Sequence, residues 1–200
     1  MFPGHKNMGA ATFLFPTPLV LCGTYDANGR ANLATLAWAG ICCSEPPAVQ
    51  ISVRRERHTY AAIIDRKAFT VCLPSSDQAV IADFCGMASG RNTDKLERAS
   101  LTAKRGQFVD APVVAEFPVC LECRMIHRLE IGSHDLFVGE VLASWVDEKY
   151  LDGTGAADLL SMSPIAYGPS TGGGQYFTLG PSAGKSFEIG KSLIDAVKPR

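Results

Sequence analysis

Tight turns divide this chain into short apolar segments, and their spacing constrains the fold more than any other feature. The segment 26–29 reads Asp-Ala-Asn-Gly, which favours a β-hairpin because Asn-Gly tolerates a positive φ at both turn positions. This turn separates a strand predicted over 18–24 from an extended or looping segment over 31–40. The segment 49–53 then alternates apolar and polar residues, which is the period of a half-buried strand.

The strand pattern continues through the middle of the chain. A strand is predicted over 68–73, where Pro74 ends it. Two longer extended segments, 116–131 and 136–146, surround the turn 132–135 and predict a long hairpin.

Helices are predicted at two points only. Thr59 is expected to cap a short helix over 60–65. Ser75 and Gln78 have the spacing of a capping box for a helix that reaches about Phe84. Antiparallel strands joined by turns, with a few inserted helices, predict a mainly β (α+β) barrel and not a parallel α/β sheet.

Composition limits the class of protein. The 200 residues are 46% hydrophobic with a net charge of −1, which predicts one domain with a core of ordinary size. The glycine-rich sequence from Asp152 on predicts an irregular tail over 152–200. The balanced charge predicts no nucleic-acid partner. The apolar run 10–21 is too short to span a bilayer, so no membrane partner is expected.

Seven cysteines are an odd number for a disulfide framework, and we expect free, structural thiols in a cytoplasmic protein. Cys120 and Cys123 match a redox or metal spacing. However, they lie in a strand-like run, where residues three apart point to opposite faces. No metal site is therefore predicted.

Sequence motifs for self-sufficient catalysis are missing. The segment 180–186 resembles a phosphate loop, but only three residues separate its glycines where the motif has four. No dinucleotide fingerprint, nucleophile elbow or zinc-binding helix is found, and the four histidines are scattered. If the chain does chemistry, a cofactor is expected to carry it, with no catalytic residue from the protein.

The segment 86–95 combines small, flexible and charged residues in a way that a core does not need. Gly90 is expected to adopt backbone angles closed to other residues and to let the chain approach a ligand. Ser89, Arg91 and Lys95 add a hydroxyl and two cations. Taken alone, the segment fits a solvated corner between helices as well as it fits a ligand-binding loop.

Five short motifs occur together in this chain. They are Asn32-x-x-Thr35-x-x-Trp38, Arg57-His58-Thr59, Ser89-Gly90-Arg91-x-x-Asp94-Lys95, Leu121-Glu122-Cys123 and the run from His134 to Val141. In this order and spacing the chain resembles the flavin reductase-like family, and within it the flavoredoxin branch. The match covers about 14–150, with a weaker extension to Tyr176. The resemblance implies an FMN-binding split β-barrel that usually forms a homodimer, with flavin sites near the subunit interface.

The resemblance supplies a set of candidate cofactor-binding residues. They are Asn32, Thr35, Trp38, Ser52, Arg57, Thr59, Ser89, Gly90, Arg91, Lys95, His134 and Tyr167. Asn32 and Thr35 are expected on exposed backbone, where the alternative is a polar loop facing water. Trp38 either packs beside the flavin ring or lies in the core.

Charge suggests roles for part of this set. Thr59 and Arg57 are expected to bind the phosphate at a helix N-terminus, although a charged run is otherwise a solvated face. Lys95 is expected near N1 and the C2 carbonyl of the ring, where a cation stabilises reduced FMN; its alternative is an exposed helix lysine. His134 and Tyr167 are expected to contact the flavin, unless His134 is merely solvated in its turn.

The implied activity is hydride transfer from NADH or NADPH to N5 of FMN, followed by electron transfer to a second acceptor, such as an electron-acceptor protein or a monooxygenase component. One alternative is a non-catalytic flavoprotein that holds FMN and relays electrons between partner proteins. Another is a split barrel that binds a different ligand, such as a pyridoxine derivative. The sequence does not separate these alternatives.

Overall fold

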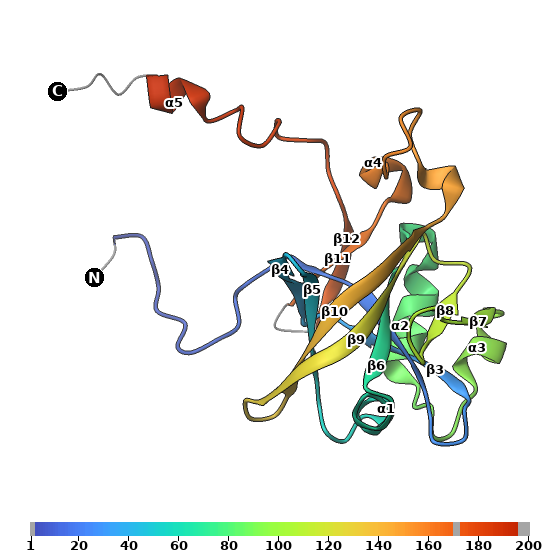
Figure 1. Ribbon diagram of the computed structural model, residues 1–200. Coiled ribbons are helices and arrows are strands. Elements are labelled where there is room, and N and C mark those ends of the chain that lie inside the picture. Colours follow the sequence, from blue (N-terminus) through green and yellow to red (C-terminus); the bar gives the residue numbers. More distant parts are fainter. Residues whose placement is uncertain (1–2, 170–172, 196–200) are drawn as a thin grey trace.

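The computed structural model describes residues 3–169 and 173–195, and its main element is a curved antiparallel sheet (Figure 1). In spatial order its seven strands are β3 (Ala31–Leu36), β2 (Val20–Tyr25), β6 (Ala68–Leu73), β9 (Val119–Glu130), β10 (Asp135–Val146), β5 (Pro47–Val53) and β4 (Ala39–Ser44). The edge strands β3 and β4 do not pair with each other in the described part of the chain, so the barrel is split. The predicted fold class is confirmed.

Two smaller sheets were not predicted. They are formed by β1 (Thr17–Pro18), β11 (Ile165–Gly168) and β12 (Gln175–Thr178), and by β7 (Ala103–Arg105) with β8 (Pro112–Val114). The tail expected to be irregular thus contains two strands, and also α4 (Leu159–Met162) and α5 (Lys191–Asp195). The prediction was wrong because β11 pairs with β1, about 150 residues earlier in the chain, and local signals do not show such a partner. Residues 170–172 and 196–200 of the tail lie outside the described residues.

The remaining helical elements are α1 (His58–Arg66), η1 (Ser76–Gln78), α2 (Ala79–Met87), α3 (Lys95–Arg98) and η2 (Glu148–Tyr150). The predicted capping box of Ser75 and Gln78 is present, but it caps the 3₁₀ turn η1, and α2 continues past Phe84 to Met87. Helices α2 and α3 pack against β3, while α1 packs against β2. These contacts bring the three helices to the same edge of the sheet.

Two apolar clusters fill the interior. Leu21 and Cys22 are successive residues of β2 and belong to different clusters, as expected for a strand buried on both faces. Cys120 and Cys123 are divided in the same way, which confirms that they point to opposite faces. All seven cysteines are free, and five of them are buried.

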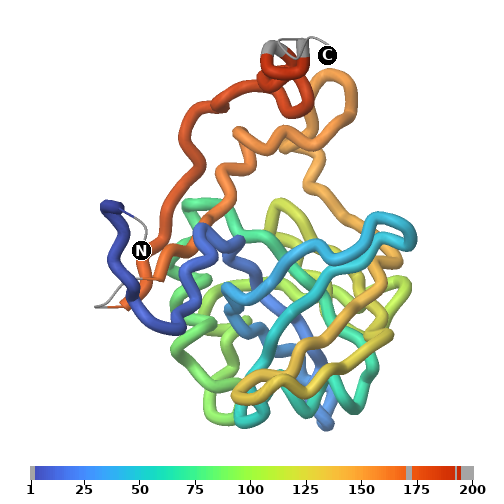
Figure 2. Tube along the Cα trace, turned by 90° about the vertical axis from the view of Figure 1, so that its left-hand side faces the viewer, coloured from blue at the N-terminus to red at the C-terminus, as the bar shows by residue number. Residues whose placement is uncertain are grey.

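Segments near both ends of the described chain leave the barrel. In Figure 1 and Figure 2, α5 lies well away from the sheet, and in Figure 1 the N-terminal segment also extends outward. Both segments carry large exposed apolar side chains, including Phe13, Leu14 and Phe187. No helix of the described residues is long and apolar enough to cross a membrane.

Candidate functional site

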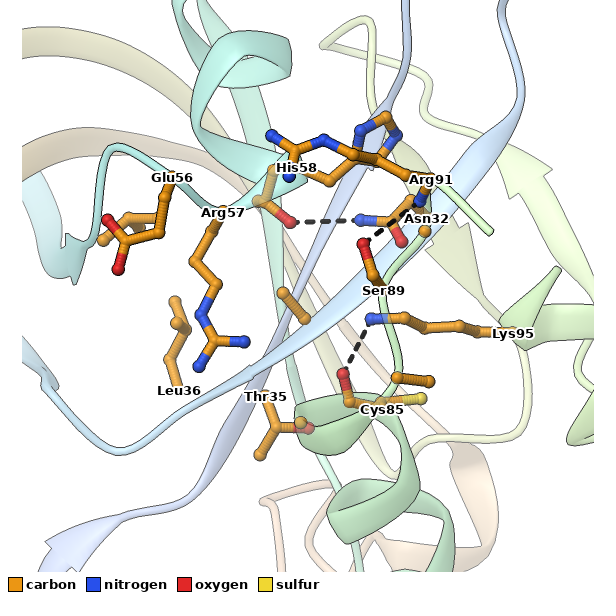
Figure 3. A pocket seen from close by; sticks show the side chains of 16 residues that line it. Asn32, Thr35, Leu36, Glu56, Arg57, His58, Cys85, Ser89, Arg91 and Lys95 are labelled. Atoms are coloured by element: carbon orange, nitrogen blue, oxygen red, sulfur yellow. Dashed lines mark hydrogen bonds between the residues drawn. The ribbon is translucent and has the colours of Figure 1, made fainter. Parts of the chain in front are cut away.

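A cavity of about 250 Å³ opens beside β3, where the start of α1, the end of α2 and the loop 88–94 meet (Figure 3). Arg57, Arg91 and Lys95 line it, and we call it the cationic cavity. None of these three side chains forms an ion pair within the described ranges. Glu56 also lines the cavity, but it pairs with Arg54 at 3.7 Å, so the three cations leave an excess of positive charge there.

The N-terminus of α1 opens into this cavity without a side-chain cap. The helix begins at His58 and its N-cap is Arg57, so the prediction that Thr59 caps it is wrong. Thr59 lies one residue inside the helix and is buried, and its hydroxyl accepts a hydrogen bond from Asn32 at 3.0 Å. The first amides of a helix have no intrahelical acceptor, so this end attracts an anion.

Asn32 and Thr35 lie on β3 and not in an exposed loop, so the expectation that they lie on exposed backbone is wrong. Asn32 is 5% exposed, and its Oδ1 atom is buried without a hydrogen-bond partner among the described residues. The Thr35 hydroxyl donates to the carbonyl of Ala82 on α2. Strand pairing places these polar side chains at the buried edge where the helices dock.

Gly90 is required by close packing and not by its backbone angles. It is not one of the glycines with a positive φ, so the conformational argument made from the sequence is wrong. A Cβ atom at this position would lie 2.2 Å from Oδ1 of Asn32 and 2.8 Å from Cδ2 of His58. The loop can approach the cavity wall only because residue 90 has no side chain.

Lys95 is a buried cation and not an exposed helix lysine. Asp94 caps α3 by accepting a hydrogen bond from the Glu97 amide, and this start directs Lys95 inward. Its ammonium donates to the carbonyl oxygens of Leu33 and Cys85, both at 2.7 Å. Burial lowers the pKa of Lys95, and Arg57 lowers it further, against an opposing effect of Cys85.

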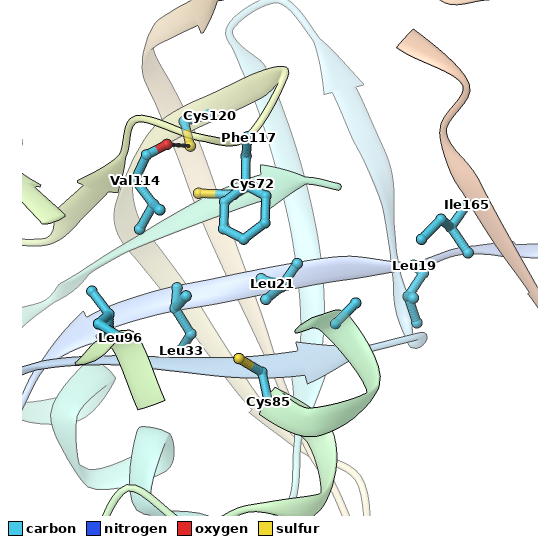
Figure 4. Packing of buried hydrophobic residues seen from close by; sticks show 11 residues of the cluster. Leu19, Leu21, Leu33, Cys72, Cys85, Leu96, Val114, Phe117, Cys120 and Ile165 are labelled. Atoms are coloured by element: carbon cyan, nitrogen blue, oxygen red, sulfur yellow. Dashed lines mark hydrogen bonds between the residues drawn. The ribbon is translucent and has the colours of Figure 1, made fainter. Parts of the chain in front are cut away.

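The wall behind Lys95 is part of the apolar core. Leu33, Cys85 and Leu96 belong to one buried cluster (Figure 4). The lysine stem therefore packs among apolar groups while its ammonium reaches the cavity.

A second cavity of about 330 Å³ adjoins the first, and we call it the aromatic cavity. Trp38, His134 and Tyr167 line it. The Trp38 indole stacks on the His134 ring at 6.2 Å between centroids, with 8° between the planes. Trp38 is 44% exposed, so it is not the core tryptophan of the alternative interpretation. Ser52 holds this strand edge by donating its amide to the Trp38 carbonyl at 2.9 Å.

The C-terminal segment closes one side of the aromatic cavity. Tyr167 on β11 and Tyr176 on β12 have ring centroids 6.1 Å apart. The Tyr176 hydroxyl donates to Asp83 of α2 at 2.7 Å, which ties the small sheet to the helix. Burial and this hydrogen bond raise the pKa of Tyr176 to about 12, so the hydroxyl remains protonated at neutral pH.

All of the residues predicted from the sequence line one or both cavities. Ser89, with its hydroxyl accepting from the Arg91 amide at 3.3 Å, lies on the cationic side, and Ser52 on the aromatic side. Sequence reasoning missed several other lining residues: Arg54, Glu56, His58, Asp83 and Tyr176. His58 stands between two predicted residues, and that position was the available signal for it.

Comparisons with known proteins agree with this fold. Residues 12–167 match the model of the flavin reductase like domain, and the protein therefore belongs to the flavin reductase-like family. The structure is similar to flavoredoxin of Desulfovibrio vulgaris (Miyazaki F), with 41% identity, a TM-score of 0.87 and coverage of 93% of this chain and 99% of that one. It is also similar to flavoredoxin from Methanosarcina acetivorans, with 31% identity, a TM-score of 0.86 and coverage of 94% and 98%. By sequence it is 22% identical over 142 residues to the FMN reductase (NADH) RutF of Acinetobacter baylyi, covering 70% of this chain and 68% of that protein.

Proposed function

We propose that this protein binds FMN, with the phosphate in the cationic cavity and the ring in the aromatic cavity. The residues present fit this group. Arg57, Arg91 and Lys95 offer charged donors, and the open N-terminus of α1 adds backbone amides. The unpartnered Oδ1 of Asn32 can accept a hydrogen bond from a ribityl hydroxyl.

One observation carries the proposal: the two cavities share part of their walls. Thr35, Leu36, Arg57 and Gly86 line both. A single ligand with an anionic end and a flat aromatic end therefore fits across them. The similarity to two flavoredoxins and to an FMN reductase supports the same ligand class.

When bound, FMN supplies the centre that accepts a hydride from NADH or NADPH and passes electrons to a second acceptor. Lys95 lines only the cationic cavity, so we assign it to the phosphate end, which differs from the expectation that it lies beside N1 of the ring. Arg57 lines both cavities and Arg54 lines the aromatic one, so these two cations lie on the side where negative charge on the ring would be stabilised. Trp38 and Tyr167 flank the ring position and exclude water from it.

The proposed activity has a direct test in two steps. Purified protein is mixed with FMN, and retention of the flavin absorbance after desalting measures binding. NADH and NADPH oxidation are then followed with FMN and an electron acceptor present. We expect binding and turnover with at least one nicotinamide. Protein that stays colourless at saturating FMN contradicts the flavin site.

A second candidate function is that of an electron-relay flavoprotein, favoured by the likeness to flavoredoxins. It predicts bound FMN that dithionite reduces and an acceptor reoxidises, with no turnover on either nicotinamide. FMN binding without nicotinamide oxidation would therefore support the electron-relay function and contradict the reductase function.

We further propose that the protein is a cytoplasmic homodimer that passes electrons to an acceptor protein or a monooxygenase component. Phe13 and Leu14 are 59% and 87% exposed, and a second copy of the chain that covers these apolar side chains would bury them. Light scattering coupled to size-exclusion chromatography measures the mass. A monomeric mass across micromolar concentrations contradicts the dimer.

A further inference from the structure

His58 has a buried ring nitrogen without a hydrogen-bond partner in the described part of the chain, and it can form an ion pair with Asp26 only when the ring is protonated. It is the first residue of α1 and lines the cationic cavity beside Asn32 and Gly90. Its side chain is 22% exposed, but Nε2 is buried and has no hydrogen-bond partner in the described part of the chain. Oδ2 of Asp26 lies 3.9 Å from Nε2, which is too far for a hydrogen bond. An unsatisfied buried group of this kind needs an explanation, and binding of a proton together with an anion supplies one here.

Charged groups face His58 from three parts of the fold. They are Asp26 and Arg30 at the β2–β3 hairpin, Glu56 and Arg57 before α1, and Arg91, Asp94 and Lys95 around the start of α3.

The carboxylates in this set are already engaged. Asp26 accepts hydrogen bonds from Arg30, Glu56 pairs with Arg54 at 3.7 Å, and Asp94 caps α3. Positive charge therefore dominates around the imidazole. Burial lowers the pKa of His58, Asp26 opposes this effect, and Arg91, Arg30 and Lys95 lower the pKa further.

We infer that His58 takes up a proton from solvent when the phosphate of a flavin enters the cationic cavity, and that the imidazolium then contributes to phosphate binding. The inference rests on the proposed FMN site. A dianion beside Arg57, Arg91 and Lys95 cancels the repulsion that keeps the ring neutral and adds an attraction of its own. By linkage, a proton on His58 strengthens FMN binding to the same extent that FMN strengthens proton binding.

Calorimetric titration tests this linkage through the number of protons exchanged. FMN and riboflavin are each titrated near pH 6.5, the ordinary pKa of histidine, in two buffers of different ionisation enthalpy. We expect the wild type to take up more protons with FMN than His58→Gln does, by at most one. Riboflavin lacks the phosphate and is expected to show no difference between the two proteins.

Comparing the two proteins removes the proton exchange of the phosphate itself, whose second pKa is about 6. His127→Gln is the matched control, because His127 is exposed on β9 and lines neither cavity; it is expected to behave as wild type. The FMN affinity of His58→Gln should fall roughly fivefold near pH 6 and match wild type near pH 8, as for the loss of one partly exposed charge.

The outcomes separate the inference from the function on which it rests. FMN binding with equal proton uptake in wild type and His58→Gln overturns the inference and leaves the FMN site in place. No FMN binding by the wild type overturns both. If His58→Gln does not fold, an NMR titration of the His58 ring in the wild type decides: its pKa must rise with FMN and not with riboflavin.

Discussion

Two parts of the sheet bury charge in opposite ways. Asp135, at the start of β10, is completely buried and accepts hydrogen bonds from Tyr60 at 2.6 Å, Arg128 at 2.7 Å and Arg55 at 3.0 Å. Glu122 on β9 is also completely buried and accepts from three backbone amides and from Trp145 at 2.7 Å. Every carboxylate oxygen there has a partner.

The cationic cavity shows the reverse arrangement. Lys95 is buried with carbonyl partners and no carboxylate, and neither Oδ1 of Asn32 nor Nε2 of His58 has a partner among the described residues. An unpaired buried polar group costs stability, and a ligand that supplies the missing partner offsets that cost. The difference distinguishes charge that holds the fold together from charge that is available to a ligand.

The largest effect is expected from replacing a buried carboxylate whose oxygens all accept hydrogen bonds. In Glu122→Gln an amide NH₂ group replaces one carboxylate oxygen, so the N–H donors that face this oxygen in the wild type lose their acceptor. We expect the free energy of unfolding to fall by about 2–3 kcal/mol. Urea titration measures this, and the FMN affinity of the folded protein should stay within a factor of about two. Glu140→Gln is the control: its ion pair with Arg124 at 2.6 Å is partly exposed and should contribute less than about 1 kcal/mol.

An intermediate effect is expected from adding a side chain at Gly90, where the loop lies close to the cavity wall. The methyl group of Gly90→Ala would meet Asn32 and His58, so we expect FMN affinity to fall about tenfold through displacement of the loop. Gly153→Ala is the control, because a Cβ there has nothing within 4 Å and its φ is not positive. Equal FMN affinities for the two variants would show that the loop around Gly90 is not part of the site.

The smallest effect at neutral pH is expected from Asp135, whose contribution to stability changes only at acidic pH. Burial alone would raise the pKa of Asp135, but the hydrogen bonds from Tyr60, Arg128 and Arg55 lower it to about 2. The stability that Asp135 contributes is therefore present above its unfolded pKa of about 3.9 and is lost as the pH falls toward 2. Melting temperatures between about pH 5 and 2 should fall more steeply for wild type than for Asp135→Asn. Parallel curves would contradict this assignment.

Local signals in the sequence predicted most of the large sheet. The Asn-Gly turn, the alternation near Val49 and the long hairpin all depend on residues close together in the chain, and each matches an observed element. Strand β11 pairs with the distant strand β1, β12 in turn pairs with β11, and short β7 has no clear local pattern. These elements could not be read from the sequence.

The residues predicted for the site lie close together in the structure, but the contacts that each of them makes were not predicted. The shared motifs identified residues that line both cavities, but they also include Glu122 and Asp135, whose contacts are structural. The inward direction of Lys95 depends on how α3 docks on β3, and the buried state of Asn32 depends on helix packing over the sheet edge. Neither follows from spacing alone.

The most direct test of the central claim compares FMN with riboflavin, which differ only in the phosphate. Fluorescence titration gives both affinities for wild type and for Lys95→Met, which keeps an apolar stem and removes the charge. We predict that wild type prefers FMN by about a hundredfold, and that Lys95→Met weakens FMN about thirtyfold while riboflavin changes less than about twofold. Equal loss for both ligands, or unchanged FMN affinity, would contradict the assignment of the cationic cavity to the phosphate.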